Sequence, residues 1–367
     1  MNEELHDEIL LTMVEGVGSL TFKRLYDHFG NCQAILAAPE NELQAVGGIG
    51  SKIASQITRA KETLNIDGLI ELCRRERIEI ISQRDNRYPE LLKLIYDPPQ
   101  ILYVKGTLTP QDAISFAVIG TRMMSPYGRR LTTLLTRGLV QYGITIISGL
   151  AKGVDGAAHR ATLEMGGRTI AVLGSGLARI YPKEHAELAE QIVENGAIIS
   201  EYHPLMGPNK GTFPQRNRIV AGMSIGVLVV EAPKKSGAMI TARLAYEQGR
   251  ELFAVPGNVD STSSGGCNQL IRDGAVLVES VDDILESLGP LFKPVRDQVA
   301  GEIRHPNEFQ LNEIERRVLQ QIGTAATPLE QIIESSELDP HQVLVAINVL
   351  ERRRLIVKTA QEKFARV

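Results

Sequence analysis

The chain has 367 residues, more than one ordinary domain, so two or three domains are predicted. No run of about 18 uncharged apolar residues occurs, which excludes a transmembrane helix. The 40 lysines and arginines against 44 aspartates and glutamates give a net charge of −4, which excludes a histone-like basic surface but allows a local basic groove. The acidic start MNEELHDEIL and three widely spaced cysteines without a CxxC motif predict a reduced, cytoplasmic protein with neither a disulfide framework nor a zinc site.

The first 80 residues are predicted to be helical and contain two similar glycine turns. Gly16-Val-Gly18 and Gly48-Ile-Gly50 each lead into a helix, the pattern of a helix-hairpin-helix module, in which backbone amides approach a phosphate. A module that serves only packing or a protein partner is the alternative. The predicted helices are Glu4–Val14, Leu20–Phe29, Ala34–Ala37, Glu40–Ala45, Lys52–Leu64 and Asp67–Glu76.

The middle of the chain has the pattern of a doubly wound α/β domain. Residues 81–113 are rich in proline and predict a connector, with strands near Ile78–Ser82 and Ile101–Lys105. From there to Leu288, continuous apolar strands alternate with amphipathic helices, which predicts a parallel sheet covered on both faces. The expected strands are Ser115–Gly120, Ile144–Ser148, Thr169–Leu173, Ala197–Ser200, Ile225–Glu231, Leu252–Val255 and Ala275–Val278. The expected helices are Ser125–Tyr142, Val154–Met165, Glu184–Asn195, Pro214–Ala221, Ala238–Gln248 and Cys267–Arg272.

The C-terminal part has the outline of a winged helix. Pro290–Gln310 carries prolines and charges with little periodicity and is predicted to be a linker. Three helices are expected at Asn312–Ile322, Leu329–Ser335 and Pro340–Arg353, followed by a hairpin of Leu355–Lys358 with Phe364–Val367. The expected domains are residues 1–80, 81–290 and 311–367, with 291–310 as the linker.

Five glycine-rich turns follow predicted strands. Parallel strands bring such turns to one edge of a sheet, where ligands bind, and their free amides suit an anion. A row of them therefore predicts a phosphate-bearing ligand. The turn residues expected to contact phosphate are Gly120, Ser148, Gly149, Gly174, Ser236, Gly237 and Gly257.

Cationic side chains follow the same strand ends. Arg122 directly precedes a helix opened by Ser125, so its guanidinium can reach a phosphate, unless it pairs with a nearby carboxylate. Lys183 begins a helix, where it opposes the helix dipole, unless it is an ordinary exposed lysine. The segment from Lys210 to Arg218 interleaves cations with Phe213, which suits single-stranded nucleic acid. Lys152 and Lys235 add to this rim.

Catalytic candidates are weak. His159 and His185 have no paired Ser or Cys at a nucleophile turn, and His203 has the setting of a turn histidine. Asp155 at a helix start is explained by the helix dipole. HExxH, Walker-lysine and DxD motifs are missing from the sequence. No catalytic residue is therefore predicted.

The ordered motifs of the middle domain resemble those of the DprA/Smf DNA-processing family. They are Gly120-Thr-Arg122…Ser125-Pro-Tyr127-Gly128, Ser148-Gly-Leu-Ala-Lys-Gly-Val-Asp155-Gly-Ala-Ala-His159, Tyr181-Pro-Lys183, Phe213-Pro-Gln-Arg216-Asn217-Arg218-Ile219, Ser236-Gly-Ala-Met-Ile-Thr241-Ala-Arg243 and Val255-Pro-Gly257-Asn258. Outside residues 115 to 280 the resemblance is one of architecture alone.

This resemblance implies an extended Rossmann-like domain between a helix-hairpin-helix (SAM-like) module and a winged-helix module. It implies a protein that binds single-stranded DNA without base preference, protects it, and loads the RecA recombinase during natural transformation. It also implies a homodimer that is not an enzyme and needs no cofactor, metal or membrane. The DNA-binding residues it implies are Gly120, Arg122, Ser125, Lys152, Lys183, Lys210, Phe213, Arg216, Asn217 and Arg218, with Thr241 added to the phosphate-binding turns. The pocket lysine is expected to be Lys183, with Lys210 as second choice.

Two other classes compete with this hypothesis. The cytokinin-activating phosphoribohydrolases share the fold but need a glutamate three residues after the threonine of their phosphate turn, where this chain has Leu244. A dinucleotide-dependent oxidoreductase needs G-x-G-x-x-G at the first strand exit, where this chain has Gly120-Thr-Arg-Met-Met-Ser. A large arginine where a pyrophosphate must approach the backbone argues against a coenzyme.

Overall fold

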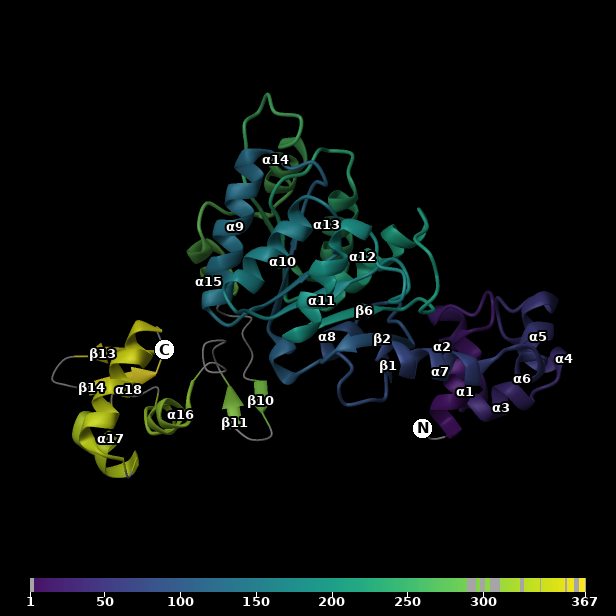
Figure 1. Ribbon diagram of the computed structural model, residues 1–367, viewed down its shortest axis with the longest axis horizontal. Coiled ribbons are helices and arrows are strands. Elements are labelled where there is room, and N and C mark those ends of the chain that lie inside the picture. The colour runs from purple at the N-terminus through teal and green to yellow at the C-terminus, as the bar shows by residue number, and fades with distance from the viewer. Residues whose placement is uncertain are drawn as a thin grey trace.

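The computed structural model describes residues 3–288, 295–297, 301–303, 311–323, 327–336, 338–353, 355–359 and 363–366. A helical N-terminal module leads into a nine-stranded sheet with helices on both faces, and three helices with a small sheet lie towards the C-terminus (Figure 1). The predicted α/β architecture between two smaller modules is therefore confirmed.

The N-terminal module is built around the two glycine turns. Gly16 and Gly48 adopt left-handed backbone angles, with φ of 93° and 91°, which glycine tolerates without strain. The turns pack reciprocally: Gly16 lies against Ile53, and Arg24 Nη1 donates to the Gly47 carbonyl over 3.2 Å. The helices are α1 (Glu3–Thr12), α2 (Ser19–Phe29), α3 (Cys32–Ala37), α4 (Glu40–Ala45), α5 (Ser51–Thr58), α6 (Ala60–Thr63) and α7 (Ile66–Glu76). The single helix predicted at Lys52–Leu64 is wrong, because the chain breaks at Arg59 into α5 and α6.

The central sheet has the strand order β1-β2-β6-β5-β4-β3-β7-β8-β9. Neighbours from β6 to β9 run parallel, whereas β2 runs antiparallel to both β1 and β6. The strands are β1 (Glu79–Ser82), β2 (Ile101–Gly106), β3 (Ser115–Ile119), β4 (Thr145–Ser148), β5 (Thr169–Val172), β6 (Ala197–Ser200), β7 (Gly226–Val229), β8 (Glu251–Ala254) and β9 (Val276–Leu277). The predicted parallel sheet is therefore confirmed from β6 to β9, and the connector adds two strands, β1 and β2, at one edge, where the pairing is antiparallel.

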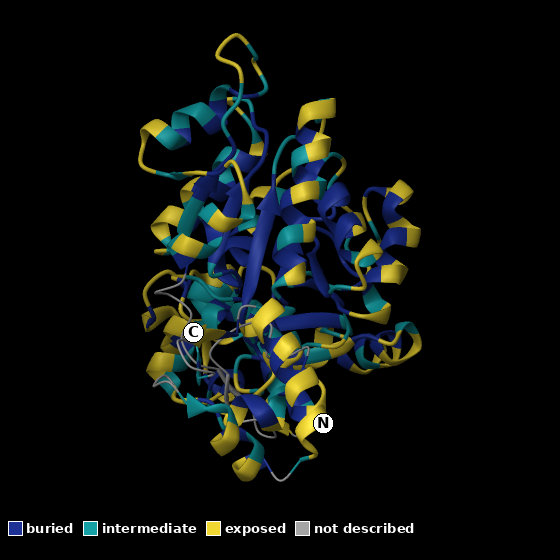
Figure 2. Cartoon of the chain, turned by 90° about the vertical axis from the view of Figure 1, so that its left-hand side faces the viewer, coloured by how far each residue is buried: buried dark blue, intermediate teal, exposed yellow. Residues whose placement is uncertain are grey.

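Both faces of the sheet are buried, so its strands are apolar throughout. In β3, Phe116 and Val118 join the core on one face, and Ala117 and Ile119 join the core on the other. Figure 2 shows the dark blue sheet between helices whose outer sides are exposed. The helices of this domain are α8 (Glu90–Lys93), α9 (Pro126–Gln141), α10 (Val154–Glu164), α11 (Ala186–Glu194), α12 (Thr212–Gly222), α13 (Gly237–Glu247), α14 (Gly265–Arg272) and α15 (Val281–Leu288), with 3-10 turns at η1 (Pro110–Ala113) and η2 (Lys183–His185).

The C-terminal part contains helices α16 (Glu313–Gln320), α17 (Leu329–Ser336) and α18 (Pro340–Arg352). The predicted hairpin is confirmed, since β13 (Ile356–Thr359) pairs antiparallel with β14 (Lys363–Arg366). A short strand that the pattern missed, β12 (Thr327–Pro328), pairs with the other edge of β14. In the predicted linker, β10 (Val295–Asp297) pairs with β11 (Gly301–Ile303), and its other residues lie outside the described ranges.

Two chemical features of the whole chain bear on function. Cys32, Cys73 and Cys267 are buried and unpaired, and burial raises the pKa of each thiol, to about 11 for Cys73 and about 12 for the other two. Among the described helices, none combines the length and the apolar character that crossing a bilayer requires.

Candidate nucleic-acid interface

The strand order reverses between β3 and β7, and the carboxyl ends of these strands open into a cleft of about 640 Å³. Such a switch point is where open α/β sheets bind ligands, because the loops diverge there to opposite faces. We call this the switch-point cleft. Its walls come from the exits of β3, β4 and β7, from Tyr181, and from α12 and α13. Its lining includes Gly120, Thr121, Arg122, Gly149, Asp155, Tyr181, Lys210, Phe213, Arg216, Asn217, Lys235, Ser236, Gly237 and Thr241.

An aromatic pair and a guanidinium form one wall of the cleft. The Arg122 Cζ lies 5.6 Å from the centroid of the Phe213 ring, and the Phe213 and Tyr181 rings are 5.6 Å apart and tilted by 45°. Gly174 makes room for Phe213, since a Cβ there would lie 2.7 Å from the ring. Rings beside an exposed arginine offer stacking surfaces for bases and a charge for the backbone.

Three exposed cations line the cleft. Arg122, Lys210 and Lys235 are exposed, and the structure gives none of them an ion pair within its described residues. Their charges are therefore available to an anionic ligand.

Two other predicted cations lie outside the lining. Lys152 is paired with Glu184 at 2.5 Å, and Lys183 begins η2 on the surface beyond Tyr181. Of the two candidates for the pocket lysine, Lys210 lines the cleft and Lys183 does not. Which of them contacts DNA stays a prediction.

The turn after β4 is already occupied by the buried carboxyl group of Asp155. Its Oδ2 accepts from the amides of Gly149 over 3.1 Å and Ala151 over 3.3 Å. Beside it, the buried Arg216 donates through Nη1 to the Gly149 carbonyl over 2.7 Å and to the Val172 carbonyl. Burial raises the pKa of Asp155 and lowers the pKa of Arg216 to about 10, so the guanidinium stays charged at neutral pH. The two side chains stabilise the cleft floor from within.

The turn after β3 is filled in the same way by Glu231, which lies two positions after the end of β7. The Ser125 amide donates to Glu231 Oε2 over 2.8 Å, and the Thr121 amide donates to the Glu231 carbonyl over 2.7 Å. Glu231 is 2% exposed, and a Cβ at Gly128 would lie 2.0 Å from its Oε2. Ser125 is occupied as the N-cap of α9, accepting from the Gly128 amide. This carboxylate takes the place at a helix start where a pyrophosphate would bind in a coenzyme fold.

The other predicted turn residues divide into two groups. Ser236, Gly237 and Thr241 line the cleft, where Asn217 Nδ2 lies 3.5 Å from the Gly237 carbonyl. Ser148 is fully buried and donates to the Val118 carbonyl over 2.7 Å, and the Gly257 amide donates to Asn268 Oδ1 over 3.1 Å. Ser148 and Gly257 are therefore not part of the cleft surface.

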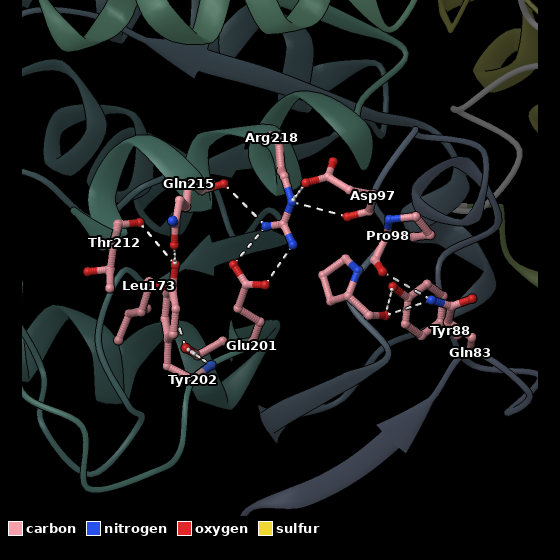
Figure 3. A network of polar contacts seen from close by, with 12 residues as sticks. Gln83, Tyr88, Asp97, Pro98, Leu173, Glu201, Tyr202, Thr212, Gln215 and Arg218 are labelled. Atoms are coloured by element: carbon pink, nitrogen blue, oxygen red, sulfur yellow. Dashed lines mark hydrogen bonds and ion pairs between the residues drawn. The ribbon is translucent and has the colours of Figure 1, made fainter. Parts of the chain in front are cut away.

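Arg218 lies away from the cleft, in a buried ion network (Figure 3). Its Nη1 and Nη2 contact Glu201 over 2.7 and 2.6 Å, and its Nε contacts Asp97 Oδ2 over 2.9 Å. The network joins α12 to the exit of β6 and to the connector. The prediction that Arg218 contacts DNA does not fit this position, because its guanidinium donors are occupied by protein carboxylates.

His159 and His185 are buried and hydrogen-bonded within the protein. His159 is fully buried with Nδ1 2.7 Å from Thr169 Oγ1, and His185 Nδ1 donates to the Leu150 carbonyl over 2.9 Å. Burial lowers the pKa of His159 to about 3 and also lowers that of His203.

A family profile described as "DNA recombination-mediator protein A" matches residues 79–289, which hold the whole cleft. The chain belongs to this family. Profiles for a SAM-like helix-hairpin-helix tandem and a DprA winged-helix domain match residues 8–60 and 303–358, so the expected classes of the two flanking modules are confirmed. The resemblance to the DprA/Smf family is confirmed with them.

Relatives with similar sequences or structures match most of the chain. "Protein Smf" of Synechocystis is 37% identical over 343 residues, covering 92% of this chain and 86% of that protein. "DNA processing protein DprA" of Bacillus subtilis is 42% identical over 216 residues, covering 59% and 74%. The X-ray structure of DprA from Streptococcus pneumoniae superposes with a TM-score of 0.68 at 34% identity, covering 77% of this chain and 97% of that one. A structure of DprA from Helicobacter pylori, whose title describes a single-stranded DNA binding mode, gives a TM-score of 0.53 at 33% identity over 58% and 95%.

Tyr181 and Glu231 were not predicted as site residues. Tyr181 belongs to the Tyr181-Pro-Lys183 motif, and a tyrosine beside a predicted cation was a usable signal for a stacking ring. Glu231 ends an apolar strand, and nothing near it in sequence shows that its carboxylate reaches the start of α9, 106 positions away.

Proposed function

We propose that this recombination-mediator protein binds single-stranded DNA without base preference in the switch-point cleft. The observation that carries the proposal is the row of Arg122, Phe213 and Tyr181 on one wall, with unpaired Lys210 and Lys235 in the same lining. Rings stack on any base and cations follow any phosphate backbone, so this chemistry is tolerant of sequence. The single-stranded DNA binding mode described for the relative from Helicobacter pylori supports the same ligand.

The occupied turns favour a polynucleotide over a coenzyme. Asp155 and Glu231 take amides after β4 and β3 that a dinucleotide would need for its phosphates. Phosphates in this cleft must therefore be held chiefly by side-chain cations, which suits a chain of phosphates crossing an open groove.

We further propose a non-catalytic role for the protein. Asp155 is the one carboxylate among the described residues that line the cleft, and its Oδ2 is engaged with two backbone amides. In keeping with the family, the bound strand would be protected from nucleases and passed to the RecA recombinase by a homodimer. Release of free adenine from AMP by the purified protein would overturn the non-catalytic assignment and favour a phosphoribohydrolase.

Substitution of Arg122 by alanine tests the site. We expect the affinity for oligo-dT to fall tenfold or more, since a charge-assisted hydrogen bond is worth about 1.5–3 kcal/mol. The melting temperature should stay unchanged because the side chain is exposed. Fluorescence anisotropy at fixed salt measures the affinity, and the slope of log K against log salt should be near −3.5 for about five neutralised phosphates.

Arg272→Ala is the matched control, an exposed arginine outside the cleft lining. Affinity for oligo-dT unchanged in Arg122→Ala, or a wild-type protein that prefers duplex DNA, would refute the proposal.

A further inference from the structure

The outer face of α9 carries a second basic groove beside the switch-point cleft. It has a volume of about 590 Å³, and its lining includes Met124, Arg129, Arg130, Leu134 and Arg137. The lining residues that belong to α9 are spaced as i, i+3, i+4, i+7, i+8 and i+11, so they share one face of the helix: Pro126, Arg129, Arg130, Thr133, Leu134 and Arg137. Leu134 is 58% exposed, and nothing in the described residues covers this face.

The arginines of this groove differ in their partners. Arg137 is paired with Glu164 of α10 at 2.7 Å. Arg129 and Arg130 are exposed, and no ion pair to either occurs among the described residues. Two neighbouring guanidiniums without counter-charges form a local positive field on a chain whose net charge is −4.

An aromatic ring is held next to these cations. Tyr127 is 39% exposed, its hydroxyl donates to the Pro256 carbonyl over 2.8 Å, and Arg130 Cζ lies 5.8 Å from the ring centroid. The hydrogen bond holds the ring in place on the surface. A fixed ring beside unpaired arginines repeats the combination of Phe213 and Arg122 in the cleft.

The groove and the cleft are separated by one residue. Arg122 lines the cleft, Met124 lines the groove, and Met123 between them is 88% exposed. Two residues of chain span at most about 7 Å, so a strand leaving the cleft at Arg122 meets the groove at once. The hydrogen bonds of the Thr121 and Ser125 amides to Glu231 hold this loop at both ends.

We propose that single-stranded DNA leaving the cleft continues over Met123 onto α9, where Arg129 and Arg130 contact successive phosphates and Tyr127 offers a ring to a base. This inference rests on the proposed function and extends its site by a second group of contacts. The charge of the face and its continuity with the cleft favour DNA over the other candidate occupant, an acidic protein segment.

The test compares oligo-dT of increasing length, from about 4 to about 20 nucleotides, on three proteins. These are the wild-type chain, the double variant Arg129→Gln with Arg130→Gln, and the control Arg137→Gln, whose arginine lies on the same face but is already paired. In the double variant, long oligo-dT should bind about tenfold more weakly at physiological salt, with a salt slope shallower by about 1.4, because two phosphate contacts are lost. Short oligo-dT should bind as it does to the wild type, and the melting temperature should not change.

Each other outcome has a defined meaning. Long oligo-dT bound equally by the double variant and the control would overturn the α9 track while leaving the cleft intact. Short oligo-dT weakened as much as long would also overturn it, because the two arginines would then belong to the cleft. Binding of a poly-glutamate peptide that only the double variant loses, with long oligo-dT unaffected, would assign the face to an acidic partner. A wild type that binds oligo-dT of no length would refute the proposed function itself.

Discussion

Two buried carboxyl groups, those of Glu231 and Asp155, limit which anions can bind at the carboxyl edge of the sheet. The Glu231 carboxylate, just beyond β7, accepts a hydrogen bond from one backbone amide, and that of Asp155, in the first turn of α10, accepts from two. These amides would otherwise face a ligand. A buried amide without a partner costs about 1–3 kcal/mol, so these carboxylates stabilise the empty cleft. In the proposed site, phosphate binding would therefore fall chiefly to the exposed cations Arg122, Lys210 and Lys235.

Replacing Glu231 by alanine should expose this role. The variant leaves the Ser125 amide unpaired at the start of α9 and removes a side chain that is 2% exposed, so it should unfold at lower temperature. A small anion can then occupy the vacated position, as anions bind at helix starts. We expect sodium formate to raise the melting temperature of the variant more than that of the wild type.

Sodium chloride at the same ionic strength is the control for that experiment. Equal shifts in the two proteins would mean that the position is not an anion site. Because the Thr121–Ser125 loop carries Arg122, the Glu231→Ala variant should also bind oligo-dT more weakly. Formate should restore this affinity together with the stability of the variant.

At the scale of elements, the strands and helices of the sheet domain were predictable because their signals are local. The strand Ser115–Gly120 differs from β3 by one residue, since an unbroken apolar run of this length forms a buried strand. The antiparallel addition of β2 was not predictable, because its partner β6 lies more than 90 residues later and pairing leaves no local pattern. The ion pairs of Arg218 could not be predicted for the same reason, because its partners Glu201 and Asp97 belong to other elements. Arg122 and Phe213 could be assigned to one rim of the sheet from the sequence, but their contact could not be predicted because they belong to different elements.

The packing of α10 on β5 predicts a dependence of stability on pH. Thr169 Oγ1 donates to the Ile146 carbonyl, so His159 Nδ1 carries the proton in their contact, and the fully buried ring stays neutral. Burial lowers its pKa from 6.5 to about 3 in the folded state. Between these two pKa values the unfolded chain therefore binds more protons at His159 than the folded chain does. The contribution of neutral His159 to the free energy of unfolding is complete above pH 6.5 and is lost as the pH falls towards 3.

Comparison with His159→Gln isolates this contribution from that of Asp155, whose raised pKa acts in the opposite direction. The difference in free energy of unfolding between wild type and variant, measured in urea at several pH values, should shrink by up to about 1.4 kcal/mol per pH unit below 6.5. A difference that stays constant from pH 7 to pH 4 would contradict the neutral, buried state of His159.

The whole molecule has two kinds of junction. The N-terminal helices and the α/β domain share one apolar core: Leu69 and Cys73 of α7 belong to the same cluster as Tyr103 of β2 and Ile192 of α11. Figure 1 shows α7 beside β1 and β2 at this edge of the sheet. The apolar cluster of the C-terminal helices contains, among the described residues, members from Leu311 onward alone. The first junction is therefore a continuous core and the second joins two separate cores.

Truncations at the two ends should accordingly have unequal effects. Removing residues 1–77 uncovers Ile101 and Tyr103, which are 4% and 2% exposed, and the lost burial should lower the melting temperature of the sheet domain markedly. Removing residues 311–367 takes away a separate core and should leave that melting temperature unchanged. Differential scanning calorimetry of the full chain and both truncations measures this, with short oligo-dT binding as the check that the cleft persists. A C-terminal truncation that destabilises the sheet domain as strongly as the N-terminal one would show that the two cores are coupled after all.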